Sequence, residues 1–306
     1  MRRYFLVKVG QSLLLLLGVL VLVFFMLRLT GDPARLMLSR EASPEQVEAF
    51  REAMGFNRPL IVQFWDFFTK ALVGDFGKSL HFKAPALPMV LQRLPATVQL
   101  AGTALLIAMV LGIPIGLVGG FNPGTLVDSL GRLLALLGQG IPNFWLALML
   151  ILFFAVRLEW LPAFGRDELR SVILPAFVLG LPTLAQLVRL TRSAVLEIRG
   201  EDFIRTAHSK GLEIRVIYAK HVLRNVSIPL ISVIGVQFGY MLGGSIIIEA
   251  VFAWPGIGQL LEQAIGWRDF PLVMAIAVFT SLAVLAINLL TDVAYAIIDP
   301  RIRYGH

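Results

Sequence analysis

Long, predominantly apolar stretches limit how this chain can fold more than any other feature of its sequence. The first covers residues 9–27 and follows three basic residues, Arg2, Arg3 and Lys8. A helix of about 20 apolar residues, rising about 1.5 Å per residue, crosses the hydrocarbon core of a bilayer. With 57% hydrophobic and 15% charged residues, the chain holds more apolar surface than a water-soluble core can bury. The sequence predicts an all-α integral membrane protein and nearly excludes a cytosolic enzyme.

The same criterion of length and apolar content predicts six transmembrane helices. They are expected at residues 9–27, 95–119, 130–156, 172–196, 226–250 and 271–298. The first lacks a small-residue cleavage site, so we interpret it as a retained anchor rather than a signal peptide. The third is interrupted by Gly138, Gly140 and Pro142, a break that membrane helices tolerate when neighbours satisfy the backbone.

Basic residues are distributed unequally between the short loops. Twelve Lys and Arg fall on one predicted side and four on the other, leaving out the long segment 31–94. Short loops rich in Lys and Arg stay in the cytoplasm, whereas long loops cross largely regardless of charge. We therefore expect both termini on the cytoplasmic side of the membrane (N-in/C-in).

The long outer segment contains signals for two helices. Ser43 suits an N-cap, Pro44 the first helical position and Gln46 the capping box, and Gly55 suits the end of that helix. Pro59 opens a second helix with most of its aromatic side chains on one face. This face is predicted to pack on the membrane or the helix bundle; contact with an external partner is the alternative.

Nothing in the sequence supports catalysis. The chain has no cysteine, and its four histidines, His81, His208, His221 and His306, all fall outside the predicted spans. A serine nucleophile needs a base within hydrogen-bond reach, and no HExxH pair for zinc is present. We predict no catalytic, metal-binding or cofactor-binding residues in this chain.

The loop between the fourth and fifth spans carries the most informative pattern. Glu201 and Asp202 suit the positive end of a helix dipole, Lys210 suits the last turn and Gly211 the position just beyond it. The resulting short helix would carry an apolar ridge of Phe203, Ile204 and Ala207, flanked by Arg205, His208 and Lys210. Such a helix either lies on the bilayer surface or docks in a groove of a cytoplasmic partner.

Here the sequence resembles a known family. Residues 205–211 are similar to the "EAA" loop of ABC importer permeases, in the form typical of the oligopeptide/dipeptide/nickel branch. Further motifs of that branch follow the family's order along essentially the whole chain: Gly31-Asp32-Pro33, Gly74-Asp75-Phe76-Gly77, Thr191-Arg192-Ser193, His221-Val222-Leu223-Arg224-Asn225, Trp254-Pro255-Gly256, Arg268-Asp269-Phe270-Pro271 and Asp299-Pro300-Arg301. Two departures occur: Arg205-Thr206 replaces the Glu-Ala of the general motif, and Pro229 lies farther from Gly211 than usual.

The resemblance implies a type I ABC importer permease with an N-terminal helix and periplasmic segment at 1–94. A five-helix core at 95–298 and a cytoplasmic tail at 299–306 would follow. It also implies a second, homologous permease, two ABC ATPase subunits that bind ATP and Mg, and a periplasmic or lipid-anchored binding protein. Membrane lipid surrounds such a protein, and no nucleic acid is expected. The residues expected to couple to the ATPases are Glu201, Asp202, Phe203, Arg205, Thr206, Ala207, His208, Lys210 and Gly211.

Polar and small residues inside the spans supply the remaining candidates. Polar groups at membrane depth face a partner or a watery cavity, so a transport pathway or gate and plain interhelical bonding are both open. The pathway or gate candidates are Gln139, Asn143, Gln186, Gln237 and Glu249. Gly235, Gly239 and Gly243 recur every fourth residue, which favours close helix packing.

Function follows from the resemblance and not from the spans. It implies ATP-driven import of di- or oligopeptides by alternating access. Import of nickel or other metal chelates, or of glutathione-like molecules, is the alternative. A more distant alternative, an ion-coupled secondary transporter, often has inverted repeats and ionisable groups near the midplane, and we find no clear repeat.

Overall fold

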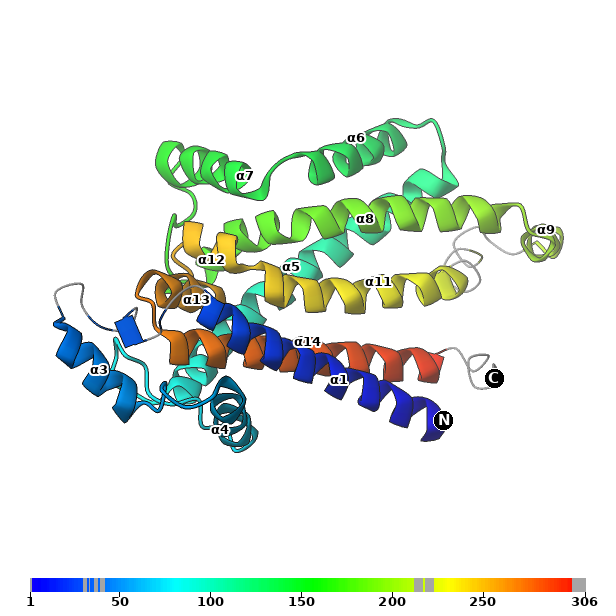
Figure 1. The fold of residues 1–306 in the computed structure, drawn as a ribbon. Coiled ribbons are helices and arrows are strands. Elements are labelled where there is room, and N and C mark those ends of the chain that lie inside the picture. Colours follow the sequence, from blue (N-terminus) through cyan, green and yellow to red (C-terminus); the bar gives the residue numbers. More distant parts are fainter. Residues whose placement is uncertain are drawn as a thin grey trace. The chain divides into compact units, whose positions relative to one another are not determined.

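The computed structural model describes residues 2–29, 32, 34–35, 38, 42–211, 217 and 223–298 (Figure 1). Every named element in these ranges is a helix, and an isolated bridge joins Lys78 to Pro85. The all-α prediction is confirmed. The predicted tail at 299–306 lies outside the described residues. Contacts divide the chain into two compact units, Met1–Thr97 with Pro255–Leu285 and Val98–Trp254 with Ala286–His306.

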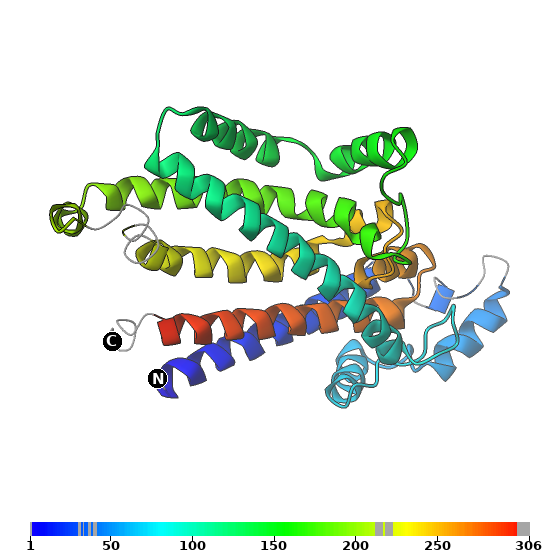
Figure 2. The same ribbon diagram turned by 180° about the vertical axis from the view of Figure 1, so that it is seen from behind.

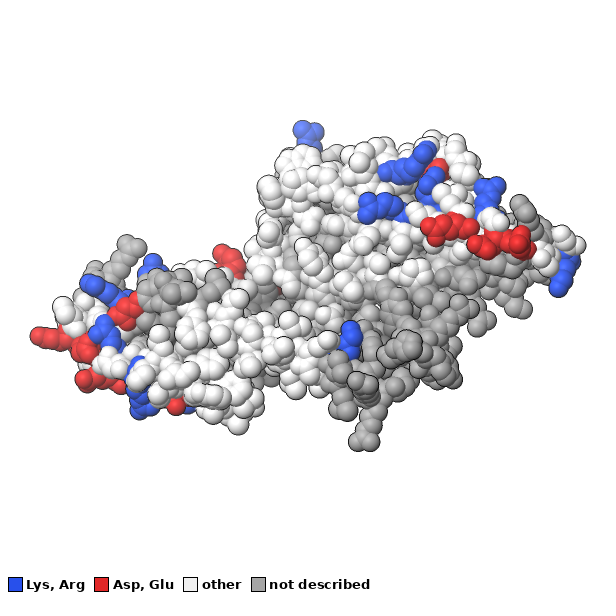
Figure 3. Space-filling model, turned by 45° about the vertical axis from the view of Figure 1, so that its right-hand side comes forward, with Lys and Arg blue, Asp and Glu red and all other residues white. Residues whose placement is uncertain are grey.

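Within the described ranges, four continuous helices are long and apolar enough to cross a membrane. They are α1 (Arg2–Leu29), α5 (Ala86–Phe121), α8 (Ile173–Arg199, preceded by the short helix η2, Leu169–Val172) and α14 (Phe270–Ile298). These confirm the first, second, fourth and sixth predicted spans, although α5 begins at Ala86 rather than at 95. Much of the surface visible in Figure 3 is uncharged, as contact with lipid requires.

The third predicted span is not one straight helix: the chain breaks at the interruption that the sequence predicts. Helix α6 (Leu126–Gly140) ends before Pro142, and α7 (Asn143–Leu150) continues into the π-helical turn η1 (Ile151–Arg157) after a bend of 109°. Ile141 and Pro142 are extended, because a proline disfavours the helical conformation of the residue before it. The pair forms a broken span or a re-entrant segment.

The fifth predicted span is also interrupted. Helix α11 (Leu223–Gly244) ends before Ser245, and α12 (Ile246–Val251) follows. The apolar part of α11, Pro229–Gly243, is shorter than a full crossing. The six predicted spans therefore correspond to four long helices, one bent pair and one shorter apolar helix.

In the first unit, the predicted outer helices are present. Ser43 Oγ accepts a hydrogen bond from Gln46 N at 3.3 Å, and Gln46 Oε1 accepts one from Ser43 N at 3.0 Å, so α3 (Pro44–Ala53) begins with a capping box. Gly55, with φ of +70°, follows its end. Nearby, the hydrogen-bonded Asp32 carboxylate raises the pKa of Arg51.

Helix α4 (Leu60–Leu72) packs against α1 through aromatic rings. The Phe24 ring lies 5.4 Å from Phe64 and 5.8 Å from Phe67, between ring centroids. Phe24 is buried, so the aromatic face of α4 covers this anchor helix, as predicted for packing. Trp65, on the same helix, stays exposed.

A buried carboxylate ties the loop before α5 to the start of α14. Asp269 accepts hydrogen bonds from Ser79 Oγ and, at 3.3 Å each, from His81 N and Leu272 N. The His81 ring stacks on Trp267 with centroids 3.9 Å apart. Trp267 caps the neighbouring helix α13 (Ile257–Gly266).

In the second unit, α6 and α11 run beside α8 (Figures 1 and 2), and α5 approaches α8 closely through glycines. A Cβ built on Gly112, Gly116 or Gly120 would lie 3.1, 2.6 and 2.6 Å from the Cβ atoms of Leu187, Thr191 and Val195. Small residues at every fourth position let two membrane helices touch along their backbones. We call Gly112, Gly116 and Gly120 the α5 glycine ladder.

Replacing Gly116 with valine is expected to destabilise the chain. The new side chain would overlap Thr191 and the Val188 carbonyl, and overpacking of this kind costs about 1–3 kcal/mol. The control is Gly102→Val on the same helix, where a Cβ meets nothing within 4 Å. Thermal unfolding followed by tryptophan fluorescence should show a lower midpoint for Gly116→Val alone; equal midpoints would contradict the ladder.

Candidate functional site

Helix α9 (Asp202–Ser209) follows α8 after a short turn and lies across its end (Figures 1 and 2). Thr206 Oγ1 donates to the Asp202 carbonyl at 2.9 Å, and Lys210 N donates to the Thr206 carbonyl at 3.1 Å. Gly211 has φ of +72°, the left-handed conformation in which a glycine ends a helix. The predicted loop helix is therefore present, with an acidic start and a glycine stop.

One member of the expected apolar ridge, Ile204, faces the interior of this chain. Ile204 is 7% exposed and belongs to the hydrophobic cluster that contains Phe121, Val195 and Val226. Its side chain thus anchors α9 to α8 and α11 within this chain and is not available to a partner. A ridge read from sequence shows which side of a helix is apolar, but not which surface covers it.

The opposite side of α9 is polar and accessible. The exposed residues of the segment are Glu201, Asp202, Thr206, Ser209, Lys210 and Gly211. The side chains of Phe203, Arg205, Ala207 and His208 lie outside the described part of the structure. Exposed groups of both signs can form charge-assisted hydrogen bonds with a protein that covers this helix.

A buried ion pair joins α6 to α8. Asp128 is 1% exposed, and it accepts hydrogen bonds from Arg192 Nε at 2.5 Å and Arg192 Nη2 at 3.3 Å. Gly124 N donates to the same carboxylate at 3.0 Å. Gly119 of α5 leaves the room that Asp128 occupies, since a Cβ there would lie 3.1 Å from Asp128 Oδ1. Three helices therefore meet at one charged contact.

The sequence analysis missed this pair, although a signal was available. Asp128 is the only acidic residue between Asp75 and Glu159. A lone carboxylate beside an apolar segment requires a cationic or hydrogen-bonding partner. Its partner is 64 residues away in the chain, a separation that no local pattern bridges.

Two of the polar pathway candidates bond to each other. Gln237 Nε2 of α11 donates to Gln186 Oε1 of α8, which is the interhelical bond that the sequence left open as an alternative. Gln139 of α6 accepts a hydrogen bond from Arg189 Nη1 of α8 at 3.3 Å, and both of these side chains are exposed. Gln139 and Arg189 can therefore reach a solute or another chain.

The two remaining candidates differ in exposure. Glu249 is fully buried on α12 and accepts a hydrogen bond from Ser245 Oγ at 2.8 Å, so it faces no open path in this conformation. Asn143 is half-buried at the first position of α7. In the described part of the chain, no three His, Asp or Glu side chains gather as metal ligands do.

The predicted glycine stripe on α11 is close-packed at Gly235 but not at Gly243. A Cβ on Gly235 would overlap the side chain of Thr291, whereas a Cβ on Gly243 would meet nothing within 4 Å. Gly239 is buried. Close approach thus occurs toward α14 at Gly235, and the longer ladder is the one on α5.

Two family descriptions match nearly all of the chain. "Binding-protein-dependent transport system inner membrane component" matches residues 112–304, and the corresponding N-terminal membrane component matches residues 1–101. The boundary between the two matches falls inside α5, close to the division between the two compact units.

Similar proteins include several glutathione transport system permease proteins named GsiC. The protein from Salmonella typhimurium is 40% identical over 291 residues, which is 95% of each chain. That from Pectobacterium atrosepticum is 40% identical over 305 residues, covering 99% of this chain and 100% of its own length. The Escherichia coli K12 protein is 39% identical over 285 residues, 93% of each chain.

Solved structures share the fold at low identity. An inward-facing structure of the MetNI methionine ABC transporter aligns with a TM-score of 0.57 at 20% identity, covering 69% of this chain and 96% of that chain. An amino acid ABC transporter bound to histidines aligns with a TM-score of 0.53 at 16% identity, covering 68% and 93%. These similarities concern the fold, which is that of type I ABC importers.

Replacing Asp128 with asparagine should destabilise the chain by about 3 kcal/mol, because it leaves the Arg192 guanidinium without its carboxylate. The double variant Asp128→Asn/Arg192→Gln should recover part of this loss, since neither charge is then unpaired. A control is Arg58→Gln, which removes an exposed ion pair to Asp66 and should cost less than about 1 kcal/mol. Thermal midpoints measure these variants and the single variant Arg192→Gln; single effects that add up to the double effect would contradict the coupling.

Proposed function

Because the chain belongs to the family of binding-protein-dependent transport system inner membrane components, we propose that it helps to import glutathione or similarly short peptides. It is a multi-pass inner membrane protein, a permease subunit of an ABC importer and a transport component rather than an enzyme. Membership of this family overturns the alternative of a stand-alone ion-coupled transporter. Such an importer works with ATPases and a substrate-binding protein.

One observation carries the cargo proposal. Relatives that are 40% identical over nearly their whole length are named glutathione transport permeases. Glutathione is itself a short peptide, so the proposal lies within the peptide class that the sequence motifs imply.

The proposed assembly contains two permeases and two ATPases. This chain would pair with a second, homologous permease, and the cargo would pass between them. The ATPases would bind ATP and Mg and hydrolyse ATP. A periplasmic or lipid-anchored binding protein would deliver cargo from outside.

Helix α9 is the proposed contact with an ATPase. Its polar side is exposed, and its Ile204 side is anchored in the cluster with α8 and α11. In the most apolar stretch of α8, 78% of the residues are buried. A push on α9 would therefore move α8 as one rigid body and switch the pathway between inward-open and outward-open states. The residues proposed to couple are Glu201, Asp202, Phe203, Arg205, Thr206, Ala207, His208, Lys210 and Gly211.

The five polar candidates for the transport pathway differ in how readily they could reach it. Gln139 stays the best candidate because its side chain is exposed. Asn143 lies next to it across the helix break. Gln186 and Gln237 would reach the pathway after their mutual bond opens, and Glu249 would act as a gate after α12 moves.

Deleting the gene for this chain should abolish uptake of radiolabelled glutathione in cells that express the complete importer and lack other glutathione transporters. Restoring the chain from a plasmid should restore uptake. Unlabelled dipeptides and nickel chelates serve as competitors. Competition by these compounds and not by glutathione would contradict the cargo proposal and leave the importer assignment intact.

Replacing Gly211 with valine should separate ATP hydrolysis from transport. Gly211 has φ of +72°, a conformation that costs an ordinary residue about 1–2 kcal/mol and a β-branched residue more. The end of α9 would therefore shift. We expect ATPase activity to persist in proteoliposomes while uptake per ATP falls about tenfold or more.

The matched control is Gly200→Val, at the other end of the same segment. Gly200 has φ of −81°, and a Cβ there meets only the Glu197 carbonyl at 3.8 Å. This variant should keep its coupling ratio. A Gly211→Val importer that assembles at normal levels with full uptake per ATP would contradict the role of α9.

A further inference from the structure

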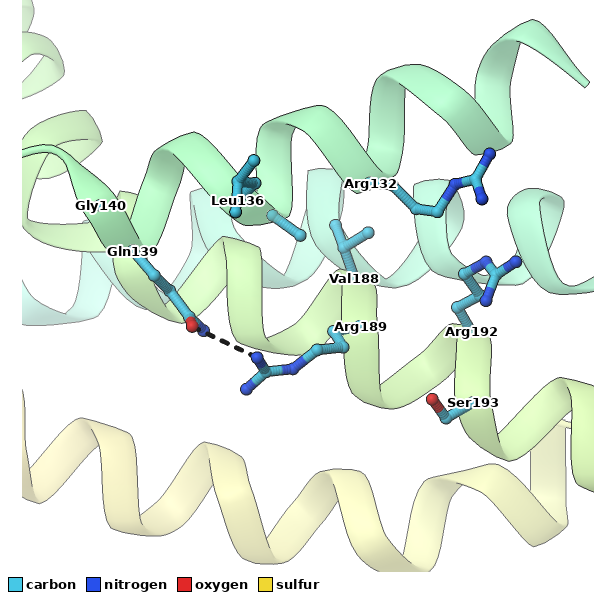
Figure 4. A pocket seen from close by; sticks show the side chains of 9 residues that line it. Arg132, Leu136, Gln139, Gly140, Val188, Arg189, Arg192 and Ser193 are labelled. Carbon is cyan, nitrogen blue, oxygen red and sulfur yellow. Dashed lines mark hydrogen bonds between the residues drawn. The ribbon is translucent and has the colours of Figure 1, made fainter. Parts of the chain in front are cut away.

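An arginine-lined groove of about 510 Å³ lies between α6 and α8. Figure 4 shows Arg132 and Gln139 of α6 and Arg189 and Arg192 of α8 around the same space. Leu136 forms an apolar part of the wall. We call this space the α6–α8 groove.

The groove has more positive charge than the chain neutralises. Arg192 is bound to Asp128, and Arg132 Nη2 lies 3.7 Å from the same carboxylate. In the part of the chain that the structure describes, Arg189 donates a hydrogen bond to the neutral amide of Gln139. Three guanidinium groups and one carboxylate leave two positive charges in excess. Cations in a membrane segment are costly unless an anion or water reaches them.

The position of these arginines along α8 suits a phospholipid headgroup. Arg189 is the first charged residue of α8 and follows 16 uncharged residues, Ile173 to Val188, which make about 24 Å of helix; Arg192 lies one turn nearer the α9 end. Headgroups occupy the outermost part of each leaflet, and long arginine side chains extend toward them. Under the proposed function, the α9 end of α8 faces the cytoplasm, so the groove opens to the inner leaflet.

The surface beside the groove is apolar and open. Leu133, Leu136 and Leu137 of α6 are 50%, 72% and 46% exposed. A ligand with an anionic head and a hydrocarbon body matches this combination, whereas a fully polar cargo would leave the leucines without a partner. Basic pockets between transmembrane helices on the cytoplasmic side bind lipid headgroups for the same reason.

We propose that the α6–α8 groove binds an anionic phospholipid, with its phosphate at the arginines that line the groove and its acyl chains along the leucines of α6. Bound there, the lipid neutralises the excess charge beside the α6–α8 contact. The inference uses the proposed function only for orientation; cargo identity does not enter.

Spin-labelled lipids test this proposal on the importer purified with its partner subunits in nanodiscs. The wild type should bind labelled phosphatidylglycerol in preference to labelled phosphatidylcholine. Each basic residue near an anionic surface contributes about fivefold to such binding. Arg132→Gln/Arg189→Gln should therefore lower the preference by about 25-fold, and Arg132→Lys/Arg189→Lys should keep most of it because lysine also binds phosphate.

The matched control removes two exposed arginines from the opposite ends of the same segments, Arg157→Gln/Arg170→Gln. This variant should keep the preference. Equal lipid selectivity in the groove variant and the wild type would overturn the proposal, as would a wild type without preference. Because the wild-type and lysine measurements need no destabilised variant, poor folding of the glutamine variant leaves the test valid.

A second arm separates a lipid from a cargo carboxylate. Millimolar glutathione should not displace the labelled phosphatidylglycerol. Displacement that Arg132→Gln/Arg189→Gln abolishes would assign the groove to cargo and overturn the lipid proposal. A wild-type importer that binds phosphatidylglycerol selectively and takes up no glutathione would contradict the proposed cargo alone.

Discussion

The close packing of α8 is the constraint on which the rest of the second unit depends. In its most apolar stretch, 78% of the residues are buried within this chain, whereas the other long helices bury only a minority of theirs. Lipid tails are as apolar as leucine, so hydrophobicity alone does not hold two membrane helices together. Shape and polar bonds have to do so, and α8 receives both: the glycine ladder from α5, Asp128 from α6 and Gln237 from α11.

These contacts explain why α9 is suited to receive a force. The helix lies across the end of α8, and Ile204 fixes it to the same hydrophobic cluster as Val195 and Val226. Under the proposed function, a displacement of α9 would pass to α8 through this cluster as well as through the short turn that joins the two helices. Packed interiors resist continuous deformation, which favours a switch between two discrete arrangements. The exposed polar residues of α9 set where a partner can attach, and the buried ones set what then moves.

Sequence reasoning succeeded where one segment determines its own structure. Apolar length placed α1, α8 and α14, and side-chain capping placed the start of α3. It located the interruption near Pro142 but not its bend of 109°, and it missed the break at Ser245, because a membrane helix continues through such residues when neighbouring groups satisfy its backbone. Neither the neighbours nor the freed groups can be identified from local sequence.

The candidate site shows the same division. Acid at the start and glycine at the end sufficed to predict α9 as an element, since caps and dipoles act within a turn or two. The burial of Ile204 and the pairing of Asp128 with Arg192 depend on segments far apart in the chain. A lone carboxylate such as Asp128 needs a partner, and only the fold decides which cation supplies it.

Polar groups at membrane depth in this chain are of two kinds, and the difference indicates what the subunit needs from its surroundings. Asp128, Gln237 and Glu249 bond to other residues of the same chain, so they stabilise one arrangement of its helices. Arg189 and Gln139 are exposed and bond chiefly to each other. Beside hydrocarbon an exposed guanidinium is unfavourable unless water or an anion reaches it. The arrangement around Arg189 is therefore complete only when water, a lipid phosphate or another chain contacts it, and the isolated subunit is a component whose polar surfaces are satisfied by assembly and by the membrane.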